Sequence, residues 1–457
     1  MSRQNAGVKQ GQTRRGFLKS AAAVAGSIGF PMVVRSQTVG QNAPSKRITM
    51  GIIGCGNQAE QDLKQWLPME DVQVVAVCDV NRAGYGYKND KQFLGREPTR
   101  DAVNKAYAAR TASGTFKGCD MHVDYREVLA RKDVDTVAII TPDHWHAIQT
   151  IQAAAAGKDI YCQKPLGLTV RDGQEMIKAV RTHNRVLQTG SQWRSAEAVR
   201  NFCEAVRNGA VGKPGRVVTY VAKNNFEGPG PGWQPTPVPE GFDYDLWLGP
   251  APKAPYHKDR CFYRFRFVSD YSGGQTTNFG HHAIGVAMWA LGLDETGPDE
   301  VWNRGAEWPL KGDLFDTATN VHFGCRFAGG LELECVTSPK SFGVRVEGEK
   351  GWIETNGRKI EASSPEIAQW APQPDSVRLY NSPNHYRNFI DCVKSRGVPA
   401  EPVETGHRVS TACHLGNIAM KLDRKLRWDP KAEQFVGDDE ANKMLQKPHR
   451  APWSYSV

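Results

Sequence analysis

A glycine-rich segment between two apolar runs is the feature that most constrains the fold of this 457-residue chain. Residues 48–53, Ile-Thr-Met-Gly-Ile-Ile, are typical of a buried strand and lead directly into residues 54–59, Gly-Cys-Gly-Asn-Gln-Ala. This is a dinucleotide fingerprint, in which Gly54 allows the tight turn and Gly56 lets the backbone approach a pyrophosphate. We expect the phosphates at the N-terminus of a helix that covers about residues 58–67.

A second apolar run, residues 72–78, ends at Asp79, which lies 20 residues beyond Ala59. An acid at that distance is expected to bind the hydroxyls of the adenosine ribose. It favours NAD over NADP because its charge repels a 2′-phosphate. The nearby Arg82 leaves NADP open as an alternative.

Two further apolar runs, residues 134–140 and 159–162, flank an alanine-rich helix. This βαβ rhythm predicts a parallel, doubly wound sheet, the Rossmann form of an α/β fold. Ligands bind at the carboxyl ends of such strands. The segments 141–146, Thr-Pro-Asp-His-Trp-His, and 163–165, Gln-Lys-Pro, follow the two runs at this edge.

The second half of the chain has the pattern of an antiparallel sheet. Residues 321–327 and 331–337 flank Ala-Gly-Gly, and residues 342–347 and 352–355 flank Gly-Glu-Lys-Gly, so each pair predicts a hairpin. We therefore expect a C-terminal α+β domain with an open-faced, mostly antiparallel sheet. The expected parts are a signal and linker (1–45), a nucleotide-binding domain (46–167), a substrate and oligomerisation domain (168–425) and a C-terminal extension (426–457).

The N-terminus predicts export. Residues 13–19, Thr-Arg-Arg-Gly-Phe-Leu-Lys, form a twin-arginine motif, and an apolar, small-residue stretch follows over residues 21–34. We expect the twin-arginine machinery to carry the folded protein to the periplasm or beyond. Because no clean Ala-x-Ala cleavage site is visible, an uncleaved signal that anchors the protein to the membrane is left open.

The net charge of +9 does not predict a nucleic-acid partner. Six of these charges lie in residues 1–45, which contain no Asp or Glu, so the remaining chain carries only +3. No basic stripe with interleaved aromatic residues stands out there. The ten cysteines form no Cys-x-x-Cys pair, and small buried thiols are the expected form.

These motifs together resemble the glucose–fructose oxidoreductase/inositol dehydrogenase (Gfo/Idh/MocA) family. The resemblance rests on residues 54–59, 141–146, 157–165 and the later segment 273–282, Gly-Gly-Gln-Thr-Thr-Asn-Phe-Gly-His-His, and covers about residues 46–450. The closing stretch is similar to a bacterial branch with an extended C-terminus. The resemblance implies an NAD(P)-dependent oxidoreductase that acts on a sugar, polyol or glycoside and forms a homo-oligomer, either a dimer or a tetramer.

The resemblance also implies two catalytic residues. Lys164 is expected to stabilise an alkoxide, and His282 to act as the general acid/base. The chain departs from the family pattern at Gln163 and Asn278, where acids are usual, and at Gly285. Loss of the first two carboxylates predicts a depressed pKa for Lys164, because its cation is left uncompensated.

The remaining candidate residues fall into two groups. Substrate contacts are expected from side chains that can bind hydroxyls or stack on a sugar ring, with a structural ion pair or ordinary packing as the alternative: Arg194, Asn278, Trp193 and Trp247. Cofactor contacts are expected from Gly54, Gly56, Asn57, Gln58, Asp79, Thr141, Pro142, His146, Gln163, Lys164 and Pro165. His144, His146, His281 and His282 lack a visible Asp or Cys partner at ligand spacing, so no metal is expected, and His144 is expected to face solvent.

Export constrains the chemistry. No free NAD pool is expected outside the inner membrane, so the cofactor should be carried in tightly bound. A net dehydrogenase then needs a second substrate to reoxidise it. The alternative is a redox-neutral, NAD-dependent glycosidase that oxidises, eliminates, hydrates and re-reduces its sugar. A non-catalytic sugar or nucleotide sensor is the lesser alternative.

Overall fold

The computed structural model describes residues 46–89, 91–111, 113–339 and 342–456. The twin-arginine motif lies outside these residues. The chain from Arg47 onward forms one unit that contains two sheets.

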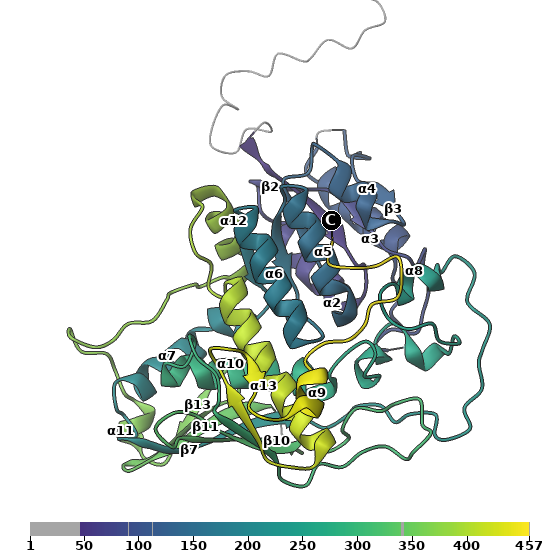
Figure 1. Ribbon diagram of the computed structural model, residues 1–457. Helices are drawn as coiled ribbons and strands as arrows, with labels where there is room; N and C mark the ends of the chain where they lie inside the picture. The colour runs from purple at the N-terminus through teal and green to yellow at the C-terminus, as the bar shows by residue number, and fades with distance from the viewer. Residues whose placement is uncertain (1–45, 90, 112, 340–341, 457) are drawn as a thin grey trace, which may run out of the picture. The chain divides into compact units, whose positions relative to one another are not determined.

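The first sheet is the predicted parallel one, and its strand order is β3-β2-β1-β4-β5-β6. Helices α4, α5 and α6 pack on one face, while α2, α3 and α12 pack on the other. Figure 1 shows α5 and α6 side by side over the sheet. The strands are β1 (Ile48–Ile53), β2 (Val72–Cys78), β3 (Asp120–His122), β4 (Thr136–Ile139), β5 (Asp159–Cys162) and β6 (Leu187–Thr189). The helices are α2 (Asn57–Trp66), α3 (Arg96–Ala108), α4 (Tyr125–Ala130), α5 (Asp143–Ala155), α6 (Val170–Thr182) and α12 (His385–Ser395).

The order of this sheet reverses beside β1, whose neighbours are β2 and β4. A crevice therefore opens at the carboxyl ends of β1 and β4. The sheet also extends beyond the expected domain boundary at residue 167, because β6 pairs with β5.

The second sheet has nine strands in the order β13-β12-β11-β7-β10-β9-β8-β14-β15. It is mostly antiparallel, as predicted, and β7 and β10 form a parallel pair. Both predicted hairpins are confirmed, by β9 with β10 and by β11 with β12. The strands are β7 (Pro214–Ala222), β8 (Glu300–Asn303), β9 (His322–Arg326), β10 (Glu332–Ser338), β11 (Gly343–Gly348), β12 (Gly351–Thr355), β13 (Ile360–Ala362), β14 (Leu426–Asp429) and β15 (Gln434–Phe435).

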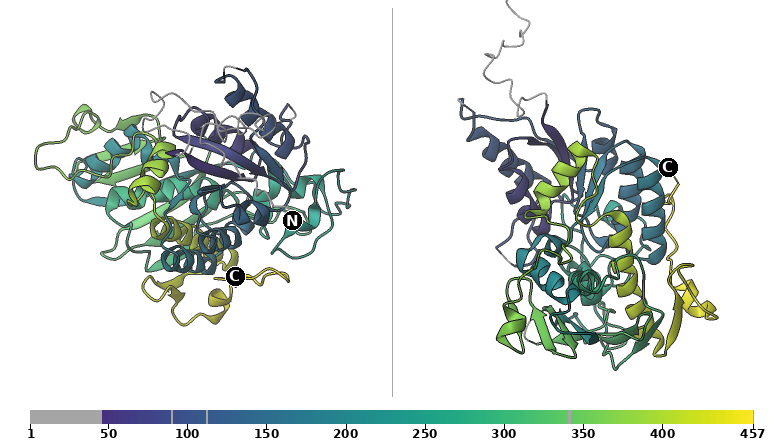
Figure 2. Two further views of the ribbon diagram at one scale, coloured as in Figure 1. Left: turned by 90° about the horizontal axis from the view of Figure 1, so that it is seen from above. Right: turned by 90° about the vertical axis from the view of Figure 1, so that its left-hand side faces the viewer.

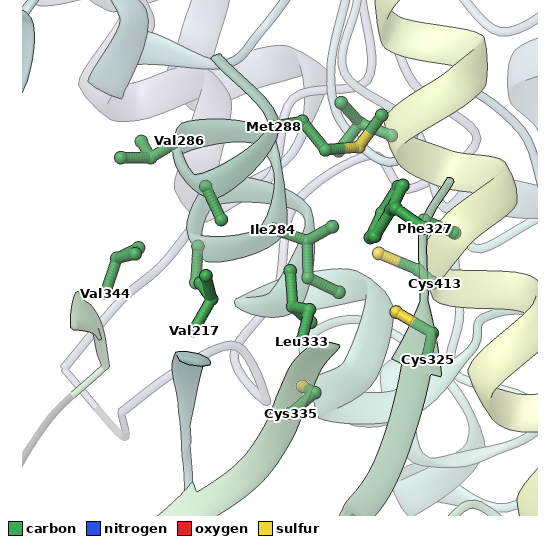
Figure 3. Packing of buried hydrophobic residues seen from close by; sticks show 14 of the residues in the cluster. Val217, Ile284, Val286, Met288, Cys325, Phe327, Leu333, Cys335, Val344 and Cys413 are labelled. Atoms are coloured by element: carbon green, nitrogen blue, oxygen red, sulfur yellow. The ribbon is translucent and has the colours of Figure 1, made fainter. Parts of the chain in front are cut away.

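Three helices bury one face of this sheet: α7 (Glu197–Arg207), α10 (Gly280–Leu291) and α13 (Val403–Leu422). In Figure 3, Ile284 of α10 points toward the strands that carry Val217 and Leu333. In the right-hand view of Figure 2, the teal helix α10 and the yellow-green helix α13 lie over the same sheet. This layer includes α10, the helix that carries His282.

The remaining helices are short: α8 (Tyr244–Leu248), α9 (Gly274–Asn278), α11 (Pro365–Ala368) and α14 (Asp439–Lys443). All ten cysteines are free and buried. Among the described residues, no helix is both long and apolar enough to cross a bilayer.

Candidate active site

One cleft brings together the cofactor residues expected from the sequence. It lies at the carboxyl ends of β1, β4 and β5, and its empty space, open mouth included, is about 1180 Å³. The expected residues that line it are Gly54, Gly56, Asn57, Gln58, Asp79, Thr141, Pro142, Gln163, Lys164 and Pro165. His146 does not line the cleft.

The glycine loop has the geometry that a dinucleotide needs. Gly54 has a φ of 95°, and a Cβ there would stand 2.5 Å from the carbonyl oxygen of Ile140. No side chain of the described residues caps the N-terminus of α2, so its first amides face the cleft without that partner. This arrangement fits a pyrophosphate.

Asp79 lies beside the same loop. Its carboxylate accepts hydrogen bonds from the backbone amides of Cys55 (2.6 Å) and Asn81 (2.7 Å), which ties the end of β2 to the glycine loop. Arg82, which left NADP open, is not part of the lining and forms an ion pair with Glu240. The acid in the cleft and the arginine outside it favour NAD.

Gly54→Ala is expected to weaken both folding and NAD binding. Positive φ alone costs about 1–2 kcal/mol for a residue with a Cβ, and the collision with Ile140 adds about 1–3 kcal/mol. Gly157→Ala is the matched control, because Gly157 also has a positive φ (76°) but nothing lies within 4 Å of an added Cβ. Denaturant unfolding and NAD titration would measure both effects. Equal losses in the two variants would contradict this account of Gly54.

Lys164 projects from the loop after β5 toward α9. Its Nζ donates hydrogen bonds to the backbone carbonyl oxygen of Asn278 (2.8 Å) and to its side-chain Oδ1 (2.9 Å). Burial, followed by the nearby charge of Arg266, lowers the pKa of Lys164 to about 8. The predicted depression of this pKa is therefore present, although desolvation is its main cause.

Two carboxylates from other parts of the chain face Lys164, so the cation is not left entirely uncompensated. Asp143, the first residue of α5, lines the cleft and accepts a hydrogen bond from Ser272 Oγ (2.5 Å). Asp62 on α2 is fully buried and accepts from Gln163 Nε2 (2.8 Å). Both act against the lowering of the lysine pKa. Sequence patterns did not identify either residue.

Asp62 explains why glutamine fits at position 163. Its carboxylate also accepts from Gln58 Nε2 (2.7 Å) and from the Tyr386 hydroxyl (2.7 Å), so it joins the cofactor loop to the lysine loop. Burial raises the pKa of Asp62 to about 6 despite these donors. A glutamate at 163 would face this buried carboxylate, whereas the amide of Gln163 donates to it.

Asn278→Asp is expected to raise the pKa of Lys164 above 8, because a carboxylate within hydrogen-bond distance favours the charged amine. The high-pH limb of the activity profile should then move upward by about 1 pH unit or more. Asn278→Leu removes the same hydrogen bond without adding charge, and its limb should not move upward. A pH–rate profile for the three proteins measures this. If activity fell at the same alkaline pH in all three, the assignment of that fall to Lys164 would be contradicted.

His282 lies on α10, near enough to Lys164 for the lysine charge to act on its ring. Its ring packs near Trp193 (centroids 5.8 Å apart), and its buried Nδ1 has no hydrogen-bond partner among the described residues. Burial, followed by the charge of Lys164, lowers the pKa of His282 well below its usual value. The ring is therefore neutral at ordinary pH and able to accept a proton. It is outside the set of cleft-lining residues.

His146 and His144, the two histidines of the segment 141–146, have structural contacts. His146 is buried below the cleft, and its two ring nitrogens face the carbonyl oxygens of Pro165 (2.8 Å) and Thr141 (2.9 Å). It supports the two motif loops and does not line the cofactor cleft. The expectation that His144 faces solvent is wrong, because it is 6% exposed and packs between Trp247 and Tyr271. Among the described residues, no cluster of three metal-ligating side chains is present.

The predicted substrate residues separate into two groups. Arg194 is buried, and its guanidinium pairs with Asp294 (2.7 Å) and Glu401 (3.1 Å), which favours the structural ion-pair alternative. Trp193 stacks on Phe342 (centroids 4.5 Å apart) beside His282. Trp247 and Asn278 line the cleft.

Aromatic side chains cover the cleft, and sequence patterns singled out only Trp247 among them. Tyr87 packs on Phe262 (centroids 4.9 Å apart), and Phe262 packs on Phe242 (5.1 Å). We call the aromatic cover the set Tyr87, Phe242, Trp247, Phe262 and Phe265, all of which line the cleft.

The C-terminal segment supports this cover. Trp453 packs against Trp145 (4.7 Å), whose indole N–H donates to the backbone carbonyl of Trp247 (3.0 Å). In Figure 1 the yellow C-terminal segment ends beside α5, the helix that carries Trp145.

Two models of one protein family match this chain. Residues 48–191 match the Gfo/Idh/MocA model described as oxidoreductase family, NAD-binding Rossmann fold, and residues 196–455 match oxidoreductase family, C-terminal alpha/beta domain. The chain belongs to the Gfo/Idh/MocA oxidoreductase family. It is an enzyme of that family, and its first domain binds NAD.

Sequence relatives of this chain include glycosidases, and a dehydrogenase of known structure shares its fold. A glycosyl hydrolase family 109 protein from Stenotrophomonas maltophilia is 28% identical over 373 residues, which cover 77% of this chain and 76% of that protein. An alpha-N-acetylgalactosaminidase from Shewanella oneidensis is 29% identical over 179 residues, 36% of each chain. The WlbA dehydrogenase from Bordetella pertussis, solved with NADH and UDP-GlcNAcA, shares the fold with a TM-score of 0.58 and 16% identity, over 84% of this chain and 99% of that one.

Proposed function

We propose that this Gfo/Idh/MocA enzyme oxidises a hydroxyl-bearing carbon of a sugar, polyol or glycoside with an NAD that stays bound. The observation that carries the proposal is that the glycine loop, Asp79 and Lys164 line one cleft, with His282 close enough to Lys164 for the lysine charge to lower the pKa of the histidine. NAD, when bound, supplies hydride acceptance and return at the nicotinamide. The glycine loop and α2 would hold its phosphates and Asp79 its adenosine ribose.

The protein side chains divide the remaining work. Neutral His282 accepts the proton of the substrate hydroxyl. The ammonium of Lys164 donates a hydrogen bond to the oxygen as negative charge develops on it, and Asn278 orients that ammonium through two hydrogen bonds. The aromatic cover and Trp145 exclude water from this end of the cleft, which strengthens both interactions.

A panel of aldoses, polyols and 4-nitrophenyl glycosides mixed with the NAD-loaded protein tests the proposal. We expect one turnover of reduced nicotinamide with at least one member, and a turnover at least about 10²-fold slower with the Lys164→Met variant. A wild-type protein that neither reduces its NAD nor cleaves any member of the panel would refute it.

The second candidate is a redox-neutral glycosidase. The similarity to a glycosyl hydrolase family 109 protein over three-quarters of both chains favours it. In such a cycle, oxidation of the sugar acidifies the neighbouring C–H, which permits elimination of the glycosidic group, addition of water and re-reduction. Cleavage in D₂O should then place deuterium next to the oxidised carbon with no net reduced cofactor. Cleavage without deuterium incorporation would exclude this cycle.

We further propose export of the folded protein by the twin-arginine machinery. Ten free thiols, all buried, support this route, because a protein that folds before export shields its cysteines from an oxidising compartment. Fractionation of the native host tests it: the wild-type protein should lie outside the cytoplasm, either free or membrane-anchored, and Arg14→Lys with Arg15→Lys should remain inside.

Assembly into a homo-oligomer is proposed through the outer face of the nine-stranded sheet. This face carries ladders of ion pairs, such as Arg216 with Glu334 (2.7 Å) and Arg326 with Glu300 (2.9 Å). A contact made by such groups is screened by salt. Light scattering should therefore show a dimer or tetramer that weakens as the salt concentration rises, and a monomer at all salt concentrations would refute the proposal.

A further inference from the structure

Arg266 is a second cation at the reacting end of the cleft, and the proposed chemistry does not use it. It lines the cleft together with Lys164, Asp143 and Asn278. The charge of Arg266 acts to lower the pKa of both Lys164 and Asp143. These two residues follow β5 and β4, and hydride transfer is expected at the ends of these strands. The pyrophosphate is expected elsewhere, at the start of α2.

Two aromatic rings and a backbone carbonyl hold the guanidinium of Arg266, and no acidic side chain of the described residues forms an ion pair with it. It packs over the rings of Tyr263 (3.8 Å from the centroid) and Phe265 (4.9 Å), and its Nη1 donates to the backbone carbonyl of Tyr263. Its Nε is buried and has no hydrogen-bond partner in the described part of the chain. Arg264, two residues earlier, instead forms an ion pair with Asp259.

Neither cation at this end forms a direct ion pair in the described part of the chain. Lys164 binds only the neutral oxygens of Asn278, and Arg266 enters no ion pair among residues that the structure describes. Two acids act on these cations, Asp143 on both and Asp62 on Lys164, and burial raises the pKa of both carboxyls. A partly buried guanidinium that contacts no acid and keeps a buried, unpartnered Nε is costly, so an anion that contacts Arg266 is expected from a ligand.

We propose that Arg266 binds a carboxylate of the substrate, so that the sugar is a uronic acid or a uronide. The planar guanidinium presents paired N–H groups that match a carboxylate and do not match a hydroxyl. The stacked rings of Tyr263 and Phe265 hold that plane before the substrate arrives, which limits the entropy lost on binding. This inference rests on the proposed function, because it assigns the substrate class of the same cleft.

Calorimetric titration of the NAD-loaded protein tests the inference. The probes are sodium D-glucuronate and D-galacturonate, each compared with D-glucose or D-galactose at equal ionic strength. We expect at least one uronate to bind about tenfold or more tightly than its neutral counterpart. Arg266→Gln should remove this preference. Lys258→Gln, which removes one charge from an exposed position of the same segment, should preserve it.

Three results would overturn the inference: no uronate preference in the wild-type protein, a preference that survives Arg266→Gln, or loss of NAD in place of loss of uronate from that variant. The last result would assign Arg266 to the cofactor. Nucleotide content and turnover of the sugar panel, measured on the same samples, separate these results from failure of the proposed function, which would appear as a wild-type protein that holds no NAD or that neither reduces its NAD nor cleaves any panel member.

Discussion

Lys164→Met is expected to lower kcat by about 10²- to 10⁴-fold while NAD remains bound. Methionine fills similar space but cannot donate to a developing alkoxide, and the glycine loop and Asp79 are untouched. Single-turnover reduction of the bound nicotinamide by the best sugar of the panel measures the effect. Lys178→Met is the matched control, since the side chain of Lys178 is 77% exposed, and it should retain full activity.

The pH profile adds a second readout for Lys164. Because its pKa is about 8, the donor form is lost as the pH rises through 8, and activity should fall there. Protonation of His282 should lower activity only at a far lower pH, because the pKa of His282 is well below its usual value. A Lys164→Met variant with wild-type kcat, or a wild-type profile flat beyond pH 9, would contradict the role of Lys164.

His282→Ala is expected to lower kcat by about 10²- to 10³-fold, because it removes the neutral imidazole proposed to take the hydroxyl proton. The deleted ring leaves space beside Trp193, so added imidazole should restore part of the activity. Measured kcat with and without imidazole checks both effects. Wild-type activity, or a lost activity that imidazole does not raise at any pH, would argue against His282 as the base.

The neighbouring histidine provides the contrast. His281 is fully buried and pairs with Glu401 (2.9 Å), which also binds Arg194. His281→Ala should therefore destabilise the fold by about 3 kcal/mol, as expected for a broken buried pair, and imidazole should not rescue a catalytic step. The comparison separates a chemical role from a structural one at adjacent positions.

The nucleotide loop could be predicted from sequence because its determinants are local. A buried strand, the Gly54 turn and the start of α2 lie within 20 residues, and each follows from residue type and spacing. The two hairpins of the second sheet are equally local. Lys164 and His282 were located through a family resemblance, because neither spacing nor periodicity places them together.

The rest of the site depends on contacts between distant segments. Asp62 meets Gln163 across 101 residues, and Arg194 meets Asp294 across 100. Nothing local distinguishes these residues from surface acids and bases. Arg266 lies in a segment with several basic residues, and only the fold shows that it faces the cleft whereas Arg264 pairs with Asp259.

Retention of the cofactor under the aromatic cover is the central claim of the proposed function, because an enzyme exported as proposed above would have no pool from which to replace its NAD. Native mass spectrometry of the desalted protein, purified from its own host, tests this most directly. We expect one NAD per chain in the wild-type protein, and its loss during desalting from Phe262→Ala, which opens the cover. A wild-type protein that arrives without nucleotide and does not retain added NAD through desalting would contradict the account.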